Sequence, residues 1–101
     1  MLNYQKTAQA FDLKTVANHL LSGSIDALNA CYECCDRYAD SERIALYWYG
    51  KDGRKEQYTF SELKKYASQF ANFLKSQGVG KGARISGLLP RTSELIITIL
   101  A

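Results

Sequence analysis

Proline is almost absent from this chain of 101 residues, in which it occurs once. The sequence also lacks low-complexity tracts and blocks of like charge, the features that keep many segments disordered. Hydrophobic residues make up 47% and charged residues 23% of the chain, as in ordinary soluble globular proteins. These features exclude a disordered chain and predict a single folded domain at most.

The sequence shows neither a long apolar run nor a secretory leader. The longest run, "LIITILA" at residues 95–101, is far shorter than the roughly 20 residues that cross a bilayer. The opening stretch "MLNYQKTAQAFDLKT" lacks the charged start and apolar core of a signal peptide. Because the chain also has three cysteines, an odd number, we expect a reducing compartment, the cytoplasm, and no membrane partner.

A dense basic stripe is missing as well. Residues 1–50 contain four Lys and Arg against six Asp and Glu, and residues 51–101 contain nine against four. The second half is therefore mildly basic and would attract phosphate groups. Nucleic-acid-binding domains carry a denser stripe with aromatic residues in register, so we expect no nucleic-acid partner.

Helical signals begin in the first half of the chain. Residues 1–25 form a polar lead-in with one short helix through "DLKTVANHLL", for which Asp12 is a candidate N-cap. A second helix is predicted from Asn29 to Ala39, because the Asn29 side chain can accept from the free amides of the first turn. Its apolar face would carry Leu28, Cys31, Cys35 and Tyr38.

A β-hairpin is predicted next. Side chains alternate along "IALYWY" at residues 44–49, which is the period of a strand. Asp52 and Gly53 form a strong turn pair, and "EQYTF" at residues 56–60 returns as the partner strand. The aromatic residues of this region then pack across the two strands.

The strongest helical pattern follows the hairpin. Thr59 and Glu62 have capping-box spacing at the start of a helix over residues 60–77. Gly78 would end it as a left-handed C-cap residue. An apolar stripe runs along the helix through Leu63, Tyr66, Ala67, Phe70, Phe73 and Leu74.

The last part of the chain predicts a strand and a helix. "RISGLLP" at residues 84–90 reads as a short buried strand that stops at Pro90, and a helix then begins at Thr92 or Ser93. Apolar residues lie on every side of this helix, as is typical of one buried between a sheet and further chain: they are Leu95, Ile96, Ile97, Ile99 and Leu100. We therefore expect the front piece of a longer protein, the alternative being a complete small domain whose last helix docks in its core or in a dimer.

The three cysteines gather in "CYECC", at Cys31, Cys34 and Cys35. A structural zinc site needs four ligands, and His19 is the one histidine that would complete a Cys3His set. Free cysteine often packs as a small buried hydrophobe, and no strand and turn precede this C-x-x-C as in thioredoxin-like redox sites. We expect a core role, with a small zinc module as the alternative.

Other candidate sites are weak. "GVGKGAR" at residues 78–84 follows a predicted helix and leads into a predicted strand, whereas a phosphate loop follows a strand and opens a helix. Gly80 and Gly82 then serve a turn. His19 has no Ser or Cys partner at a recognisable spacing, and no pair of carboxylates suggests acid–base chemistry. Chemistry alone predicts no catalytic, cofactor-binding or metal-binding residue in this chain.

Three stretches in order carry a further pattern. "LNACYECCDRY" has the residues of Leu-Asn-x-x-Tyr-x-x-x-Asp-Arg-His at Leu28, Asn29, Tyr32, Asp36 and Arg37. The hairpin and "YTFSELKKYASQFANFLKSQGVGKGARI" follow it, and "LLPRTSEL" has those of Pro-Arg-x-Pro-Glu-Leu at Pro90, Arg91, Glu94 and Leu95. Together they resemble the N-terminal part of AMP-forming acetyl-CoA/acyl-CoA synthetases, of the adenylate-forming, luciferase-like superfamily. The chain departs from the family pattern at Tyr38, Ala83 and Ser93.

The resemblance implies an α/β fold: helices, a β-hairpin and the start of an α/β layered sheet, the N-terminal piece of the large domain of these enzymes. Residues 1–25 would be an N-terminal lead-in, and residues 26–101 the start of the AMP-binding domain, cut off at its C-terminal end. In the family, a carboxylate attacks ATP with Mg²⁺ to give acyl-adenylate and pyrophosphate, and the thiol of coenzyme A then displaces AMP.

By this resemblance, the phosphate loop, nucleotide contacts and catalytic lysine of that family would lie downstream of residue 101. The resemblance therefore implies a scaffold segment of an acetate or short-chain carboxylate–CoA ligase that is inactive alone. Its partners would be the remainder of its own polypeptide and, in the whole enzyme, a carboxylic acid substrate. The alternative is a stand-alone interaction module that forms a homodimer through Leu95–Leu100.

Overall fold

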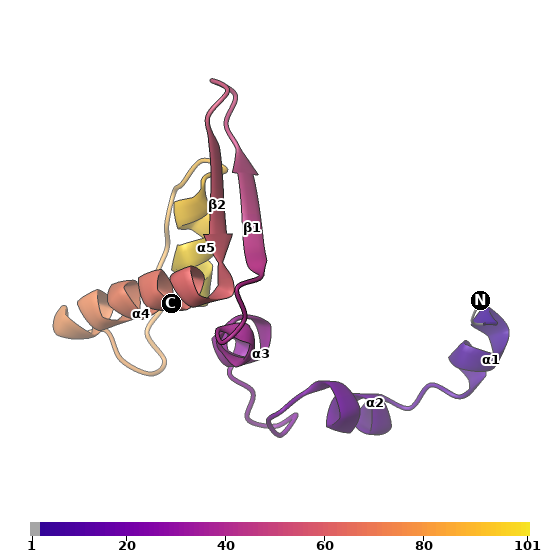
Figure 1. Ribbon diagram of the computed structural model, residues 1–101. Helices are drawn as coiled ribbons and strands as arrows, with labels where there is room; N and C mark the ends of the chain where they lie inside the picture. Colours follow the sequence, from indigo (N-terminus) through magenta and orange to yellow (C-terminus); the bar gives the residue numbers. More distant parts are fainter. Residues whose placement is uncertain (1–2) are drawn as a thin grey trace.

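The computed structural model describes residues 3–101 as helices around a two-stranded antiparallel hairpin (Figure 1). This confirms the predicted combination of helices and a β-hairpin. The radius of gyration is 17.2 Å, against about 13 Å for a compact chain of this length. The difference arises because the first two helices lie to one side of the hairpin, away from the rest of the structure.

The hairpin has the predicted strands and turn. Strand β1 (Ile44–Tyr49) pairs antiparallel with β2 (Lys55–Thr59), with Tyr47 opposite Gln57. The turn contains Gly53 at a φ of 85°, a left-handed conformation that glycine adopts without steric cost.

Helix α4 (Phe60–Ser76) begins directly where β2 ends and crosses beneath the hairpin (Figure 1). The Glu62 amide donates to the Thr59 hydroxyl at 3.1 Å, and the Thr59 amide donates to the Glu62 carboxylate at 2.8 Å. This is the predicted capping box, which satisfies two otherwise free donors at the start of the helix. Because Thr59 ends the strand and caps the helix, no linker separates the two elements.

The buried core is small and lies under the start of α4. Leu63 and Ala67 of α4 are 4% and 2% exposed, and Cys35 beside them is 2% exposed. The Cys35 thiol contacts the Phe60 carbonyl oxygen at 3.6 Å. The segment that contains Cys35 is thereby fixed to α4.

Gly78 ends α4 as predicted. The Gly78 amide donates to the Lys75 carbonyl at 3.0 Å, and the Val79 amide donates to the Leu74 carbonyl at 3.1 Å. These two bonds define a Schellman motif, which requires a left-handed residue after the C-cap. Gly78 supplies it with a φ of 81°.

Helix α5 (Ser93–Leu100) is attached to the hairpin at its first turn. The Trp48 indole N–H donates to the Arg91 carbonyl at 2.7 Å. Ser93 is 2% exposed, and its hydroxyl donates to the Glu56 carboxylate at 3.0 Å and lies 3.1 Å from the Tyr58 hydroxyl. The helix therefore begins where predicted, although Thr92 makes no side-chain cap hydrogen bond.

The prediction of a strand over residues 84–90 is wrong. This segment has no regular secondary structure, and the described residues form a sheet of two strands, β1 and β2. Its side chains are exposed: Leu88 is fully so, and Ile85 is 54% exposed. A buried strand needs neighbours for its backbone donors and acceptors, and no neighbouring strand is present in residues 3–101.

The helix predicted over Asn29–Ala39 is two pieces. Helix α3 (Ala30–Cys34) ends at Cys35, whose φ of −133° leaves the helical region, and a 3₁₀ turn η1 (Asp36–Tyr38) follows. The break turns the Cys35 side chain into the core under α4. Tertiary burial of one small residue thus overrides the continuous helical pattern.

The lead-in contains two helices instead of the one predicted. Helix α2 (Leu13–Leu20) begins at the predicted cap, with the Thr15 amide donating to Asp12 at 2.9 Å. Helix α1 (Tyr4–Gln9) was not predicted, although Asn3 caps it through the Gln5 amide at 3.1 Å. Within residues 3–101, no helix has the length and apolar character needed to cross a membrane.

The Schellman motif predicts different costs at two neighbouring glycines. Gly78→Ala has room for a methyl group but forces alanine into the left-handed region, so it should lower the free energy of unfolding by about 1–2 kcal/mol. Gly80→Ala is the matched control, because that site is equally open and has no positive φ. Urea unfolding of both variants measures the difference, and equal stabilities would contradict the assignment of the cap.

Candidate functional site: the joint around Glu33

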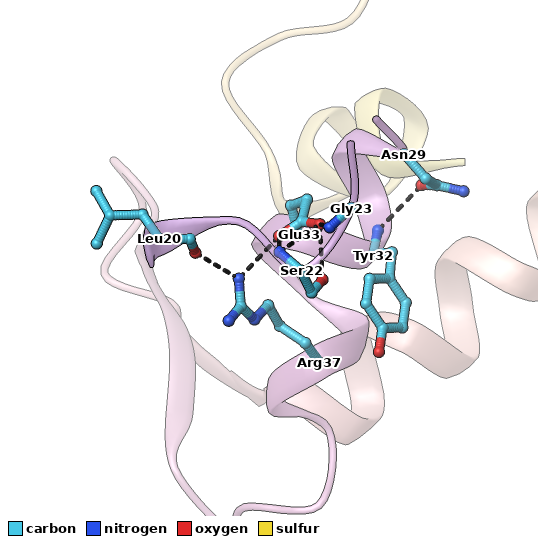
Figure 2. A network of polar contacts seen from close by, with 7 residues as sticks. All are labelled: Leu20, Ser22, Gly23, Asn29, Tyr32, Glu33 and Arg37. Carbon is cyan, nitrogen blue, oxygen red and sulfur yellow. Dashed lines mark hydrogen bonds and ion pairs between the residues drawn. The ribbon is translucent and has the colours of Figure 1, made fainter. Parts of the chain in front are cut away.

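The residues of the first motif lie together at the base of the structure. Asn29 begins α3, where its side-chain oxygen accepts from the Tyr32 amide at 3.0 Å (Figure 2). Asp36 begins η1 and accepts a weak bond from the Cys31 thiol at 3.6 Å. Asn29 therefore caps a helix, and Asp36 links η1 to α3.

Glu33, which the sequence analysis did not single out, is the centre of the polar contacts here (Figure 2). One of its carboxylate oxygens, Oε1, accepts from the Ser22 hydroxyl at 2.7 Å and from the Gly23 amide at 2.9 Å. The Ser22 amide lies 3.1 Å from both carboxylate oxygens. A single side chain on α3 thereby holds the loop that leaves α2.

Arg37 completes this arrangement from η1. Its Nη1 donates to Glu33 Oε2 at 2.8 Å and to the Leu20 carbonyl at 2.8 Å. The Glu33 side chain is 8% exposed and that of Arg37 is 28% exposed. We call the set Leu20, Ser22, Gly23, Glu33 and Arg37 the joint.

The joint sets the ionisation of its carboxylate. Hydrogen bonds from the Ser22 hydroxyl and amide, followed by that from the Gly23 amide and the charge of Arg37, hold the pKa of Glu33 below its ordinary value of 4.5. These donors stabilise the ionised form. Nη1 of the motif arginine therefore joins the end of α2 to η1 and to Glu33.

A second set of cationic contacts surrounds Tyr38, where the family pattern has histidine. The guanidinium carbons of Arg37 and Arg43 lie 5.3 and 5.5 Å from the centre of the Tyr38 ring. The Phe60 ring lies 5.3 Å away on the side of α4. Tyrosine can provide this aromatic packing, so the departure at this position is compatible with the fold.

The three cysteines occupy three different environments. Cys35 is buried, Cys31 is half-buried and Cys34 is exposed, and all three are free thiols. Burial, followed by the charge of Asp36, raises the pKa of Cys31 to about 11, and burial also raises that of Cys35. Metal ligation needs thiolates that converge. Residues 3–101 contain no group of three or more His, Cys, Asp and Glu placed to hold a metal ion.

His19 and the glycine turn were the other candidate sites in the sequence. His19 is exposed in the last turn of α2. Gly80 and Gly82 lie in a turn closed by the Ala83 amide, which donates to the Gly80 carbonyl at 3.0 Å. The turn leads into the irregular segment 84–90, so no helix begins directly after it, as a phosphate loop would require.

A groove of about 490 Å³ lies between α4, the segment after it and α5. Its lining is mainly apolar and includes Phe70, Leu74, Val79, Ile85, Leu89, Leu95 and Ile99. Small-molecule sites combine such a lining with a few convergent polar groups. Lys75 and Thr98 are the charged and hydroxyl residues of this lining, and its other residues are apolar or glycine, so the groove presents a mainly apolar surface.

The chain is similar in sequence and in backbone to known proteins. It matches the AMP-binding enzyme family over residues 33–101. Over 97% of this chain, it is 38% identical to the acetyl-coenzyme A synthetase of Bacillus subtilis. Over 73% of this chain, it is 42% identical to the acetyl-coenzyme A synthetase of Chromobacterium violaceum. Its backbone matches the crystal structure of Brucella canis acyl-CoA synthetase with a TM-score of 0.91 and 39% identity, over 99% of this chain.

The matched part is a small share of each relative. The chain spans 18% of the Bacillus subtilis protein, 12% of the Chromobacterium violaceum protein and 18% of the Brucella canis chain. The structural match includes α1 and α2, because it covers nearly the whole chain. The arrangement of these helices is therefore shared with a much longer protein.

The environments of the cysteines predict their order of reaction. Cys34 should be alkylated by iodoacetamide at pH 8 at least about tenfold faster than Cys31 or Cys35, because the latter two are covered and kept as thiols. Peptide mapping by mass spectrometry measures the order. In guanidinium chloride the three rates should converge, and faster labelling of Cys35 in the folded chain would contradict its place in the core.

Proposed function

The chain belongs to the AMP-binding enzyme family and corresponds to the N-terminal part of acetyl-CoA synthetase-like proteins, and on this premise we propose that it is a segment of an acetate or short-chain carboxylate–CoA ligase. The observation that carries the proposal is the agreement of sequence and backbone over nearly the whole chain. The reaction would join a carboxylate to coenzyme A, with ATP converted to AMP and pyrophosphate through an acyl-adenylate.

We propose that this segment acts as scaffold and is inactive alone. Two polar residues of its first motif support this role, since their side chains form hydrogen bonds within the chain: Asn29 caps α3, and Arg37 joins α2 to η1. Transfer at phosphorus depends on positioned groups that neutralise charge. We assign no catalytic, nucleotide-binding or metal-binding residue to the chain.

ATP, Mg²⁺ and coenzyme A belong to the proposed whole enzyme. The described residues do not fit the nucleotide, because the glycine turn at Gly80–Gly82 opens no helix and the groove beside α5 is apolar. The nucleotide, the metal and the carboxylic acid would contact the remainder of the polypeptide. In this proposal residues 1–25 are a lead-in, residues 26–101 begin the AMP-binding domain, and the enzyme works in the cytoplasm.

A self-associating module is the second candidate function. It is favoured by the exposed apolar side chains on and near α5, of which Ile99 is 71% and Ile96 is 37% exposed. Patches of this kind often mark an interface. Sedimentation decides between the candidates, because a compact dimer at micromolar concentration supports the module and a compact monomer opposes it.

A chimeric enzyme tests the ligase proposal. Replacing the matched segment of the Bacillus subtilis acetyl-coenzyme A synthetase with this chain should give an enzyme that releases pyrophosphate from ATP when acetate is added. The rate should lie within about tenfold of the parent, because the exchanged segment contributes no group to the reaction and alters only packing. This chain alone should release none.

The matched control carries the corresponding segment of the Chromobacterium violaceum enzyme in the same parent. If that control is active while the chimera with this chain folds and stays inactive, the proposed function is wrong. Activity of this chain alone would overturn the scaffold role.

A further inference from the structure

We propose that the Glu33 carboxylate fixes the orientation of the N-terminal segment, residues 3–21, relative to the rest of the chain. This segment contains α1 and α2, and we call the role of Glu33 that of a latch. We call residues 3–21 the arm, and α3, η1, the hairpin and α4 the body. Glu33 is on this account a positioning residue, because it acts on the placement of the arm and touches no reacting group. The inference concerns the chain itself and does not depend on the proposed ligase function.

The arm has little support along its length. It lies beside the body as an extended pair of short helices (Figure 1), and its large apolar side chains are exposed: Tyr4 by 83%, Phe11 by 60% and Leu13 by 59%. Burial in the described part of the arm is confined to its last third, where Ala17 is 8% exposed. Among residues 3–101, apolar packing therefore does not determine where α1 and the first turn of α2 point.

The joint supplies the specific contacts at the base of the arm. Ser22 and Gly23 direct two backbone amides and one hydroxyl at the Glu33 carboxylate, across 10 or 11 residues of sequence. Arg37 holds the Leu20 carbonyl with the same nitrogen that binds Glu33. Figure 2 shows these groups converging from α2, the loop after it, α3 and η1. Hydrogen bonds to a charged group are stronger than neutral ones, so this carboxylate dominates the attachment.

Replacing the carboxylate with an amide would create a conflict of donors. Oε1 of Glu33 accepts from Gly23 and Ser22, and Oε2 accepts from Arg37. A glutamine has one acceptor oxygen, and its NH₂ group would face donors in either orientation. Glu33→Gln is therefore a near-isosteric change that removes the latch and keeps the side-chain volume.

Acid should release the arm in the unaltered chain. The pKa of Glu33 is lowered by folding, so its contribution is fully present above its ordinary value of 4.5 and is lost as the pH falls through the still lower folded value. Arg37 is the charged group that faces it, from η1. From the arm and its loop, the facing groups are the neutral Ser22 hydroxyl and the two amides.

Backbone amide NMR of the 101-residue chain tests the latch. In the unaltered chain at pH 7, arm and body should show the same rotational correlation time. In Glu33→Gln, the amides of Ser22 and Gly23 should exchange with solvent at least about tenfold faster, since a charge-assisted bond is lost, and the arm amides should relax as an independent segment. Glu42→Gln, at an exposed site before β1, is the matched control and should change neither.

Each outcome decides the proposal. Faster exchange and independent motion of the arm, with unchanged signals from β1, β2 and α4, support it, and Glu33→Asp should restore part of the protection because it keeps the charge with a shorter reach. An arm that stays fixed in Glu33→Gln overturns it. A variant whose hairpin signals are lost also overturns it, since Glu33 would then support the body. Independent motion of the arm in the unaltered chain at pH 7 would also overturn the proposal.

Discussion

The rest of this structure depends on the contact between the first turns of α4 and the segment around Cys35. Leu63, Ala67 and Cys35 are almost completely buried there. The hairpin is fixed to this contact because Thr59 ends β2 and caps α4 with no residue between. The same contact fixes η1, which follows Cys35 and carries Arg37 of the joint. The joint in turn holds the arm, because Arg37 binds the Leu20 carbonyl. A small core can therefore order elements that share few direct contacts with one another.

Local patterns predicted the hairpin and α4 because each carries its own signals in sequence. Thr59 and Glu62 satisfy each other, and Gly78 ends the helix by its own conformation. The segment 84–90 was predicted wrongly. Its apolar residues indicate that it is suited to burial, but they do not indicate which neighbours would bury it. The break at Cys35 also depends on tertiary contacts, so a periodic pattern could not reveal it.

The candidate site was predictable only in part. Asn29 and Arg37 were found from the motif, and the structure gives both a role in holding the chain together. Glu33 was missed because its main partners are backbone amides in a loop, and a loop amide leaves no trace in residue type. The one local signal was its spacing of four residues from Arg37, which suits an ion pair on one helical face.

The bond between Trp48 and the carbonyl of Arg91 gives the chain a built-in optical probe. Trp48 is the single tryptophan of the sequence, and its indole N–H is held at the place where the hairpin meets the start of α5. The guanidinium of Arg54 lies 5.4 Å from the same ring. Indole emission depends on the polarity and hydrogen bonding around the ring. The tryptophan emission of this protein should therefore report on the docking of α5 onto the hairpin.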